Sequence, residues 1–219
     1  MNVIFTCGGT AGHISPALAV ASLLKERHPE ANILFVGAED GMETDLVPRA
    51  GFRLETVKIS NFQRKLSPKG IVHNVKSLGY MIGSRRSADR IIREFQPDVI
   101  VVNLGTNDSV GTKNMEMVER AAEGFLKKIR DCNPKSYILW CYGMLGDEIC
   151  SVLENAVQNY KVKTGDARVE FVKLPDTLAG EFGSRQHPGH ISHEKAAKVL
   201  TEKIQGLTNA VAGGNITSV

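Results

Sequence analysis

Short apolar segments alternate with longer amphipathic segments along most of this chain. Apolar runs rich in β-branched residues are typical of strands that are buried on both faces of a parallel sheet. They predict strands over residues 2–6, 32–37, 52–59, 99–102, 136–142 and 169–173. The segments between them predict helices over residues 15–27, 42–50, 71–95, 114–130, 148–160 and 192–204. Regular alternation of strand and helix requires right-handed crossovers and therefore a parallel sheet.

These elements predict an α/β protein, a three-layer α/β/α sandwich with a flavodoxin-like or Rossmann-like sheet. At 219 residues the chain is long enough to bury a sizeable core. We expect one domain over residues 1–205 and a flexible tail over residues 206–219, where small and polar residues dominate. The strand over residues 99–102 is expected in the centre of the sheet, followed by a loop over residues 103–108.

Two helices carry more detailed expectations. Ser15 and Pro16 have the residue types that favour an N-cap and a first helical position, so a helix is expected to begin there. The helix over residues 114–130 carries apolar residues at helical spacing, which we expect on its buried face: Met117, Ala121, Phe125 and Ile129.

Composition points to a soluble protein of the cytoplasm. The hydrophobic fraction is 42% and the charged fraction 23%, both ordinary for globular proteins. No apolar run reaches the roughly 18 residues that a membrane span needs, and the strand at residues 2–6 leaves no room for a signal peptide. The 4 cysteines lack metal or disulfide spacing, so we expect reduced thiols, no metal and no cofactor.

Positive charge is concentrated in one segment, although the net charge of the chain is only +3. Residues 58–93 hold a single acidic residue, Asp89, among nine basic ones: Lys58, Arg64, Lys65, Lys69, Lys76, Arg85, Arg86, Arg90 and Arg93. Such a face suits a phosphate-bearing ligand or peripheral contact with an anionic membrane, and we expect no nucleic-acid partner. A solvated helical face is the alternative explanation.

A glycine-rich turn follows the first expected strand and precedes a helix. Backbone N–H groups at such a turn can approach an anion, and the helix dipole favours negative charge there. The sequence therefore predicts an anion-binding loop made of Gly8, Gly9, Thr10, Gly12 and His13.

Residues 1–101 resemble the N-terminal half of the MurG family of peptidoglycan glycosyltransferases. The resemblance rests on the runs GGTAGHISPALAVA, ILFVGAEDGMETDLVPRAGF, ISNFQRKLSPK and FQPDVIV, in collinear order. It implies that the glycine-rich turn and His13 lie near the diphosphate of a lipid acceptor, and that this half faces a membrane. The family's sugar-nucleotide domain has no counterpart here, so glycosyl transfer is the least favoured of the functions considered.

Residues 98–205 resemble the C-terminal half of SGNH (GDSL-type) hydrolases, closest to the family 2 carbohydrate esterases. The resemblance rests on NLGTND, FLKKIRDCNP, ILWCYGMLG and HPGHISHEKAA. It implies that His187 is a general base and that Gly105 and Asn107 are oxyanion donors. The GDS serine of that family is absent, which leaves Cys7 and Thr10 as candidate nucleophiles by their place in the fold.

Together the two resemblances predict a chimera of two half-domains, residues 1–101 and 102–205. The expected function is SGNH-type hydrolysis of small acyl esters, weak because the serine is missing. The alternative is a non-catalytic fold that keeps an anion-binding or lipid-diphosphate-binding loop. The expected partner is accordingly a small-molecule ester or a phosphate-bearing ligand.

Overall fold

All six strands of the sheet run parallel, and the expected α/β/α architecture is confirmed. The structure is a computed structural model that describes residues 1–6, 11–58, 83–84, 86–111 and 113–212. The strand order is β3-β2-β1-β4-β5-β6, which is the order of Rossmann folds and not that of flavodoxins. The strands are β1 (Asn2–Thr6), β2 (Asn32–Ala38), β3 (Arg53–Val57), β4 (Val99–Val102), β5 (Tyr137–Gly143) and β6 (Val169–Leu174).

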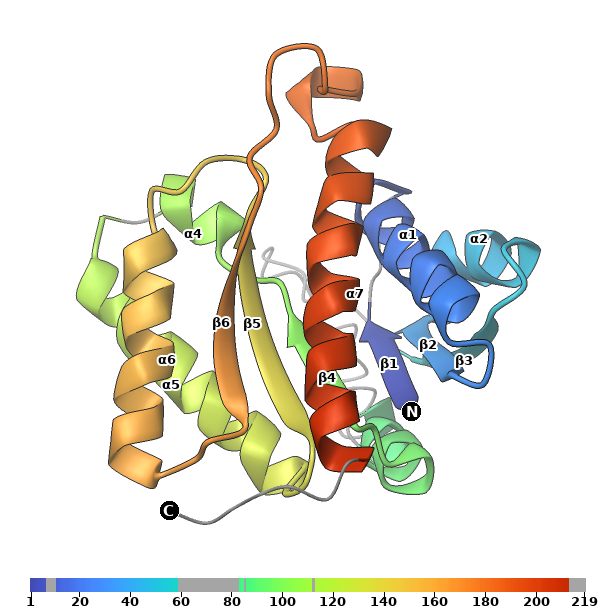
Figure 1. Ribbon diagram of the computed structural model, residues 1–219, viewed down its shortest axis with the longest axis horizontal. Helices are drawn as coiled ribbons and strands as arrows, with labels where there is room; N and C mark the ends of the chain where they lie inside the picture. The colour runs from blue at the N-terminus through green and yellow to red at the C-terminus, as the bar shows by residue number, and fades with distance from the viewer. Residues whose placement is uncertain (7–10, 59–82, 85, 112, 213–219) are drawn as a thin grey trace, which may run out of the picture.

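Helices cover both faces of this sheet (Figure 1). The helices are α1 (Ala11–Arg27), α2 (Glu43–Arg49), α4 (Thr106–Gly111), α5 (Met115–Cys132), α6 (Cys150–Thr164) and α7 (His190–Ala212). Residues 83–84 and 86–95 are also helical, and a 3-10 turn spans Ser184–Gln186. Among the described residues, no helix is both long and apolar enough to cross a membrane.

Alternate residues of each strand pack into different layers. On one face, Val3 of β1 and Leu139 of β5 share a core with helices α1, α2 and α7. On the other face, Trp140 packs with α5 and α6, while Leu34 of β2 packs with the helical residues 86–95. Figure 1 shows α1 and α7 side by side in front of the sheet, although they lie at opposite ends of the chain.

The strand β4 joins the two halves of the sheet. It pairs with β1 through Val3 opposite Val99, and with β5 through Val99 opposite Tyr137. Hydrogen bonds tie the entry to this strand from both sides. The Asp98 side chain accepts from the Asn2 backbone N–H at 2.8 Å, and the Ser136 hydroxyl donates to the Pro97 carbonyl at 2.6 Å.

Three local expectations were wrong. The first helix begins at Ala11, so Ser15 is not its N-cap and Pro16 lies inside it. The residues after β4 form the helix α4 from Thr106 onward, where a loop over residues 103–108 was expected. The last helix continues to Ala212, past the expected start of the tail at residue 206.

The buried face of α5 also differs from the expected one. Its buried residues are Val118, Ala122 and Leu126, while Met117 is 50% and Phe125 is 39% exposed. The true stripe lies one position further along the chain than the expected stripe. Both have helical spacing, and only packing against β5 and α6 selects between them.

Candidate functional site

The sheet has a switch point between β1 and β4, where the chain order of neighbouring strands reverses. In open α/β sheets, ligands bind outside the carboxyl ends of the strands at this point. The strands β1 and β4 lie side by side there, and along the chain α1 follows the first and α4 follows the second. We refer to this region as the carboxyl edge.

The glycine-rich turn lies mostly outside the described residues. Cys7, Gly8, Gly9 and Thr10 are not described, so the structure tests neither the candidate nucleophiles nor most of the anion loop. Gly12 and His13 lie in the first turn of α1, which therefore starts within the predicted loop and not after it. The first four N–H groups of a helix have no partner within it, and the start at Ala11 places the first of these donors five residues after Thr6, the end of β1.

On the β4 side, neighbouring residues hold the segment in place. The indole N–H of Trp140 donates to the Leu104 carbonyl at 3.2 Å, and the thiol of Cys141 donates to the Val102 carbonyl at 3.4 Å. Gly105 is buried with φ at +129°, and its carbonyl accepts from the Asp108 N–H at 2.9 Å. Asn107 lies in α4, and its side chain is not among the described ones.

A cavity of about 190 Å³ opens beside this segment. Leu104, Gly105 and Asp108 form one wall, and apolar residues of α5, β5 and α6 form the others. The rings of Phe125 and Trp140 meet edge to face there, with centroids 6.1 Å apart. Phe125, which was expected on the buried face of α5, thus lines this cavity instead.

His187 belongs to a different part of the structure. It follows the 3-10 turn in the segment between β6 and α7, which rises at the top of Figure 1. Its carbonyl accepts from the Gly183 N–H at 2.7 Å, and its side chain is exposed. It lines neither this cavity nor the larger one at the opposite edge of the sheet. The structure therefore brings Gly105 to the switch point but does not place His187 in a cavity with it.

Glu43 is a buried acid that the sequence pattern did not single out; it begins α2, which follows the carboxyl end of β2. Its side chain is fully buried, and one carboxylate oxygen, Oε1, accepts from the Ala38 N–H at 2.7 Å. Side chains at Gly37 or Gly41 would collide with it, because a Cβ at these positions would lie 2.4 Å and 2.1 Å from Glu43 atoms. The spacing of these two glycines before the acid was the available signal. Glu43 fixes the loop that follows β2 at the same edge as the switch point.

Charged groups at the ends of β5 and β6 are paired with each other. The ammonium of Lys173 lies 3.0 Å from the Asp147 carboxylate. Their hydrogen bond is the main cause that raises the pKa of Lys173 and lowers the pKa of Asp147. Among the described residues, no group of three or more histidine, cysteine or acidic side chains could hold a metal ion.

Comparison with known sequences finds matches to the N-terminal half of the chain. Residues 3–111 match the glycosyltransferase family 28 N-terminal domain. A UDP-N-acetylglucosamine–N-acetylmuramyl-(pentapeptide) pyrophosphoryl-undecaprenol N-acetylglucosamine transferase from Alkaliphilus oremlandii is 46% identical over 101 residues. The enzyme of the same name from Limosilactobacillus fermentum is 42% identical over 110 residues. These stretches cover 46% and 50% of this chain, but only 26% and 28% of the relatives.

Comparison with solved structures finds carbohydrate esterases. An acetyl xylan esterase from Butyrivibrio proteoclasticus aligns with a TM-score of 0.59 at 25% identity, over 88% of this chain and 56% of its own. A family two carbohydrate esterase from Clostridium thermocellum aligns with a TM-score of 0.58 at 20% identity, over 88% and 55%. Both likenesses extend across β1–β4 as well as the C-terminal half, so they reflect the shared sheet architecture.

The expectation of an SGNH-type ester hydrolase is therefore wrong. Three of the sequence relatives are glycosyltransferases at 38–46% identity, whereas the esterases are similar in fold at 20–25% identity. Proteins with an α/β sandwich catalyse many unrelated reactions, so similarity in fold alone does not indicate which activity a protein has. The origin of the chain as a chimera stays a prediction. What the comparisons establish is that residues 3–111 match the glycosyltransferase family 28 N-terminal domain.

Proposed function

We propose that this chain binds the lipid-linked diphosphate acceptor of an N-acetylglucosamine transfer reaction at its carboxyl edge. The observation that supports this best is the match over residues 3–111, because it spans β1–β4 and so includes both sides of the switch point. The relatives act, by their names, on a pyrophosphoryl-undecaprenol-linked acceptor. The proposal is limited to the acceptor, since the chain spans about a quarter of those relatives.

The anion-binding group is the turn before α1 together with the first residues of that helix. The glycines Gly8, Gly9 and Gly12 allow the backbone to approach a diphosphate, and Thr10 and His13 add side-chain donors. The 17-residue helix that follows gives a full macrodipole with its positive end at the turn. Hydrogen bonds to a charged group contribute about 1.5–3 kcal/mol each, so several of them suffice for a specific phosphate site.

Contact with an anionic membrane through residues 58–93 would bring the protein to its lipid. Most of this basic segment lies outside the described residues. Within the described part, Arg90 is paired with Glu94 at 3.1 Å and Arg93 with Asp89 at 2.8 Å. Each of these two arginines therefore faces a carboxylate of its own helix, which reduces the positive charge that this part of the segment offers to a membrane.

Vesicle flotation tests the proposal. We compare vesicles that carry undecaprenyl diphosphate with vesicles of the same surface charge made with phosphatidylglycerol. The protein should float preferentially with the diphosphate lipid, and His13→Ala should weaken that binding about tenfold through loss of a charge-assisted hydrogen bond.

The matched control is His28→Ala, because His28 follows the opposite end of the same helix, where it lies 3.3 Å from Glu30. This variant should bind like the wild type. Equal binding to both kinds of vesicle would contradict the proposal.

A further inference from the structure

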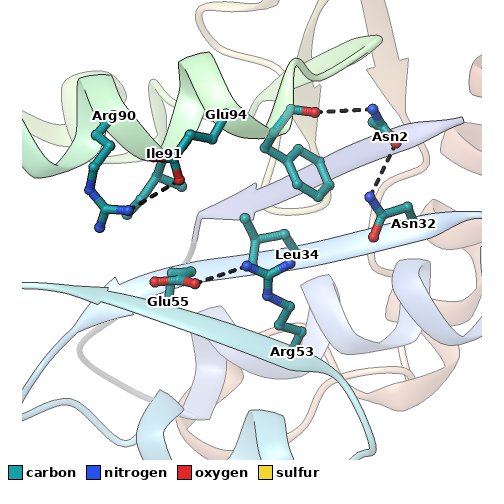
Figure 2. A pocket seen from close by; sticks show the side chains of 9 residues that line it. Asn2, Asn32, Leu34, Arg53, Glu55, Arg90, Ile91 and Glu94 are labelled. Carbon is teal, nitrogen blue, oxygen red and sulfur yellow. Dashed lines mark hydrogen bonds and ion pairs between the residues drawn. The ribbon is translucent and has the colours of Figure 1, made fainter.

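We propose that a second site, at the opposite edge of the sheet, binds a small zwitterion: an α-amino acid with an apolar side chain. The site is a cavity of about 310 Å³ between the helical residues 86–95 and strands β1–β3 (Figure 2). We call it the amino-edge cavity, since it lies where β3 begins and where the helix ends.

The floor of the amino-edge cavity is apolar. Leu34 of β2 and Ile91 and Phe95 of the helix line it, and each of them is at most 8% exposed. They form one packed cluster that extends under the helix. An apolar side chain of a ligand would cover this cluster and would lose its own contact with water.

The rim carries two ion pairs, one from each wall. On the strand, a guanidinium nitrogen of Arg53 lies 3.0 Å from the Glu55 carboxylate. On the helix, a guanidinium nitrogen of Arg90 lies 3.1 Å from the Glu94 carboxylate. Figure 2 shows these four side chains around the same gap.

Amide groups close the end of the cavity. The Asn2 side-chain amide donates to the Phe95 carbonyl at 3.0 Å, and the Asn32 amide donates to the Asn2 side-chain oxygen at 3.2 Å. These bonds tie the end of the helix to β1 and β2 and keep the walls apart (Figure 2). The cavity is thus held by fixed contacts at one end.

The balance of charge on the rim selects the class of ligand. Two arginines and two glutamates have no net charge, so an anion is attracted by one member of each pair and repelled by the other. The same holds for a cation. A ligand with both charges close together can set its carboxylate toward a guanidinium and its ammonium toward a glutamate. An α-amino acid has this arrangement, and its side chain then points to the apolar floor.

This site is independent of the proposed acceptor site. Ligand sites of open α/β sheets lie at the carboxyl ends of the strands, and the amino-edge cavity is at the other end. Three of its four charges are largely exposed, whereas the Glu55 side chain is 33% accessible. Exposed ion pairs contribute little each, so we expect weak binding.

Titration of the whole protein, followed by NMR or calorimetry, tests the proposal with three probes. Leucine carries both charges, isoamylamine lacks the carboxylate, and isocaproate lacks the ammonium. Leucine should bind about fivefold more tightly than either analogue, the advantage that one exposed ion pair typically supplies.

Two double variants make the test specific. Glu55→Gln with Glu94→Gln leaves a positive rim, so leucine should lose its advantage and isocaproate should bind better than to the wild type. Arg53→Gln with Arg90→Gln leaves a negative rim, and isoamylamine should gain instead. A damaged fold would weaken all three probes together and could not produce opposite gains.

A matched control removes an ion pair elsewhere. Arg49→Gln breaks the exposed pair with Asp45 in α2, whose atoms lie 2.9 Å apart, and should leave leucine binding unchanged. The proposal is overturned if leucine binds no better than the analogues, or if the two double variants do not shift selectivity in opposite directions.

Discussion

Gly105 shows how one residue shapes the carboxyl edge. Its φ of +129° lies in a region that side chains rarely adopt, and a Cβ there would lie 2.9 Å from Leu153 and 3.1 Å from Ile149. The glycine allows the chain to turn from β4 into α4 against a packed wall. Its role in the structure is therefore one of backbone conformation; the oxyanion-donor role that the hydrolase resemblance implies for its N–H stays a prediction.

Gly105→Ala should lower the free energy of unfolding by about 2–3 kcal/mol, because backbone strain and overpacking act together. Urea denaturation measures this change. Gly124→Ala is the matched control: Gly124 is exposed in the middle of α5, and nothing lies within 4 Å of its Cβ position. That variant should gain about 0.5–1 kcal/mol. Equal urea midpoints for both variants would contradict this conformational role of Gly105.

Cys141 should make the stability of the protein sensitive to alkaline pH. Burial raises the pKa of its thiol from the ordinary value of 9.0 to about 12. The unfolded chain releases this proton above pH 9 while the folded protein retains it, so stability falls as pH rises from 9 towards 12. The advantage of the wild type over Cys141→Ala should shrink by about 2 kcal/mol between pH 9 and pH 11.

Chemical denaturation at each pH measures this difference. The exposed Cys132 supplies the control, since its replacement by alanine should produce no such trend. If the difference in unfolding free energy between wild type and Cys141→Ala stays constant across this range, the pKa of the buried thiol is not raised.

At the scale of elements, strands were placed more accurately than helix surfaces. β1 and β4 begin and end at the predicted residues, because each is centred on a short run of apolar residues that packs into the sheet. The start of α1 was missed by four residues because Ser15 and Pro16 imitate a helix start. For α5, two neighbouring apolar stripes were available, and the choice between them depends on what packs against the helix.

At the scale of the whole molecule, contacts across β4 unite the two halves. Core residues from both ends of the chain, such as Leu24 of α1 and Ile204 of α7, belong to one cluster. The Tyr137 N–H donates to the Asp98 carbonyl at 2.8 Å, which adds to the bonds made by Asn2 and Ser136. No edge of the sheet separates residues 1–101 from residues 102–205.

Residues 1–205 are therefore expected to form a single domain that unfolds in one cooperative transition. Circular dichroism and the fluorescence of Trp140, which lies in the C-terminal half, should report the same midpoint in urea. Limited proteolysis that releases two stable halves cut near residue 100 would contradict this expectation.

The sequence by itself determined the class of fold and the resemblance of its N-terminal half to a glycosyltransferase domain. Short apolar runs predict buried strands from local sequence alone. A collinear resemblance over some hundred residues is likewise visible in the sequence itself. The carboxyl edge was predictable in outline, since parallel strands that follow one another along the chain end at a common edge.

Only the tertiary structure decided which residues share a site. Burial of Glu43 and separation of His187 from the cavity beside Gly105 depend on contacts between segments far apart in sequence. The amino-edge cavity likewise joins Asn2, β3 and the helix that ends at Phe95, three segments with no common pattern. The physical reason is that hydrophobic periodicity records whether a residue is buried, whereas the partner that buries it is set by the packing of the whole chain.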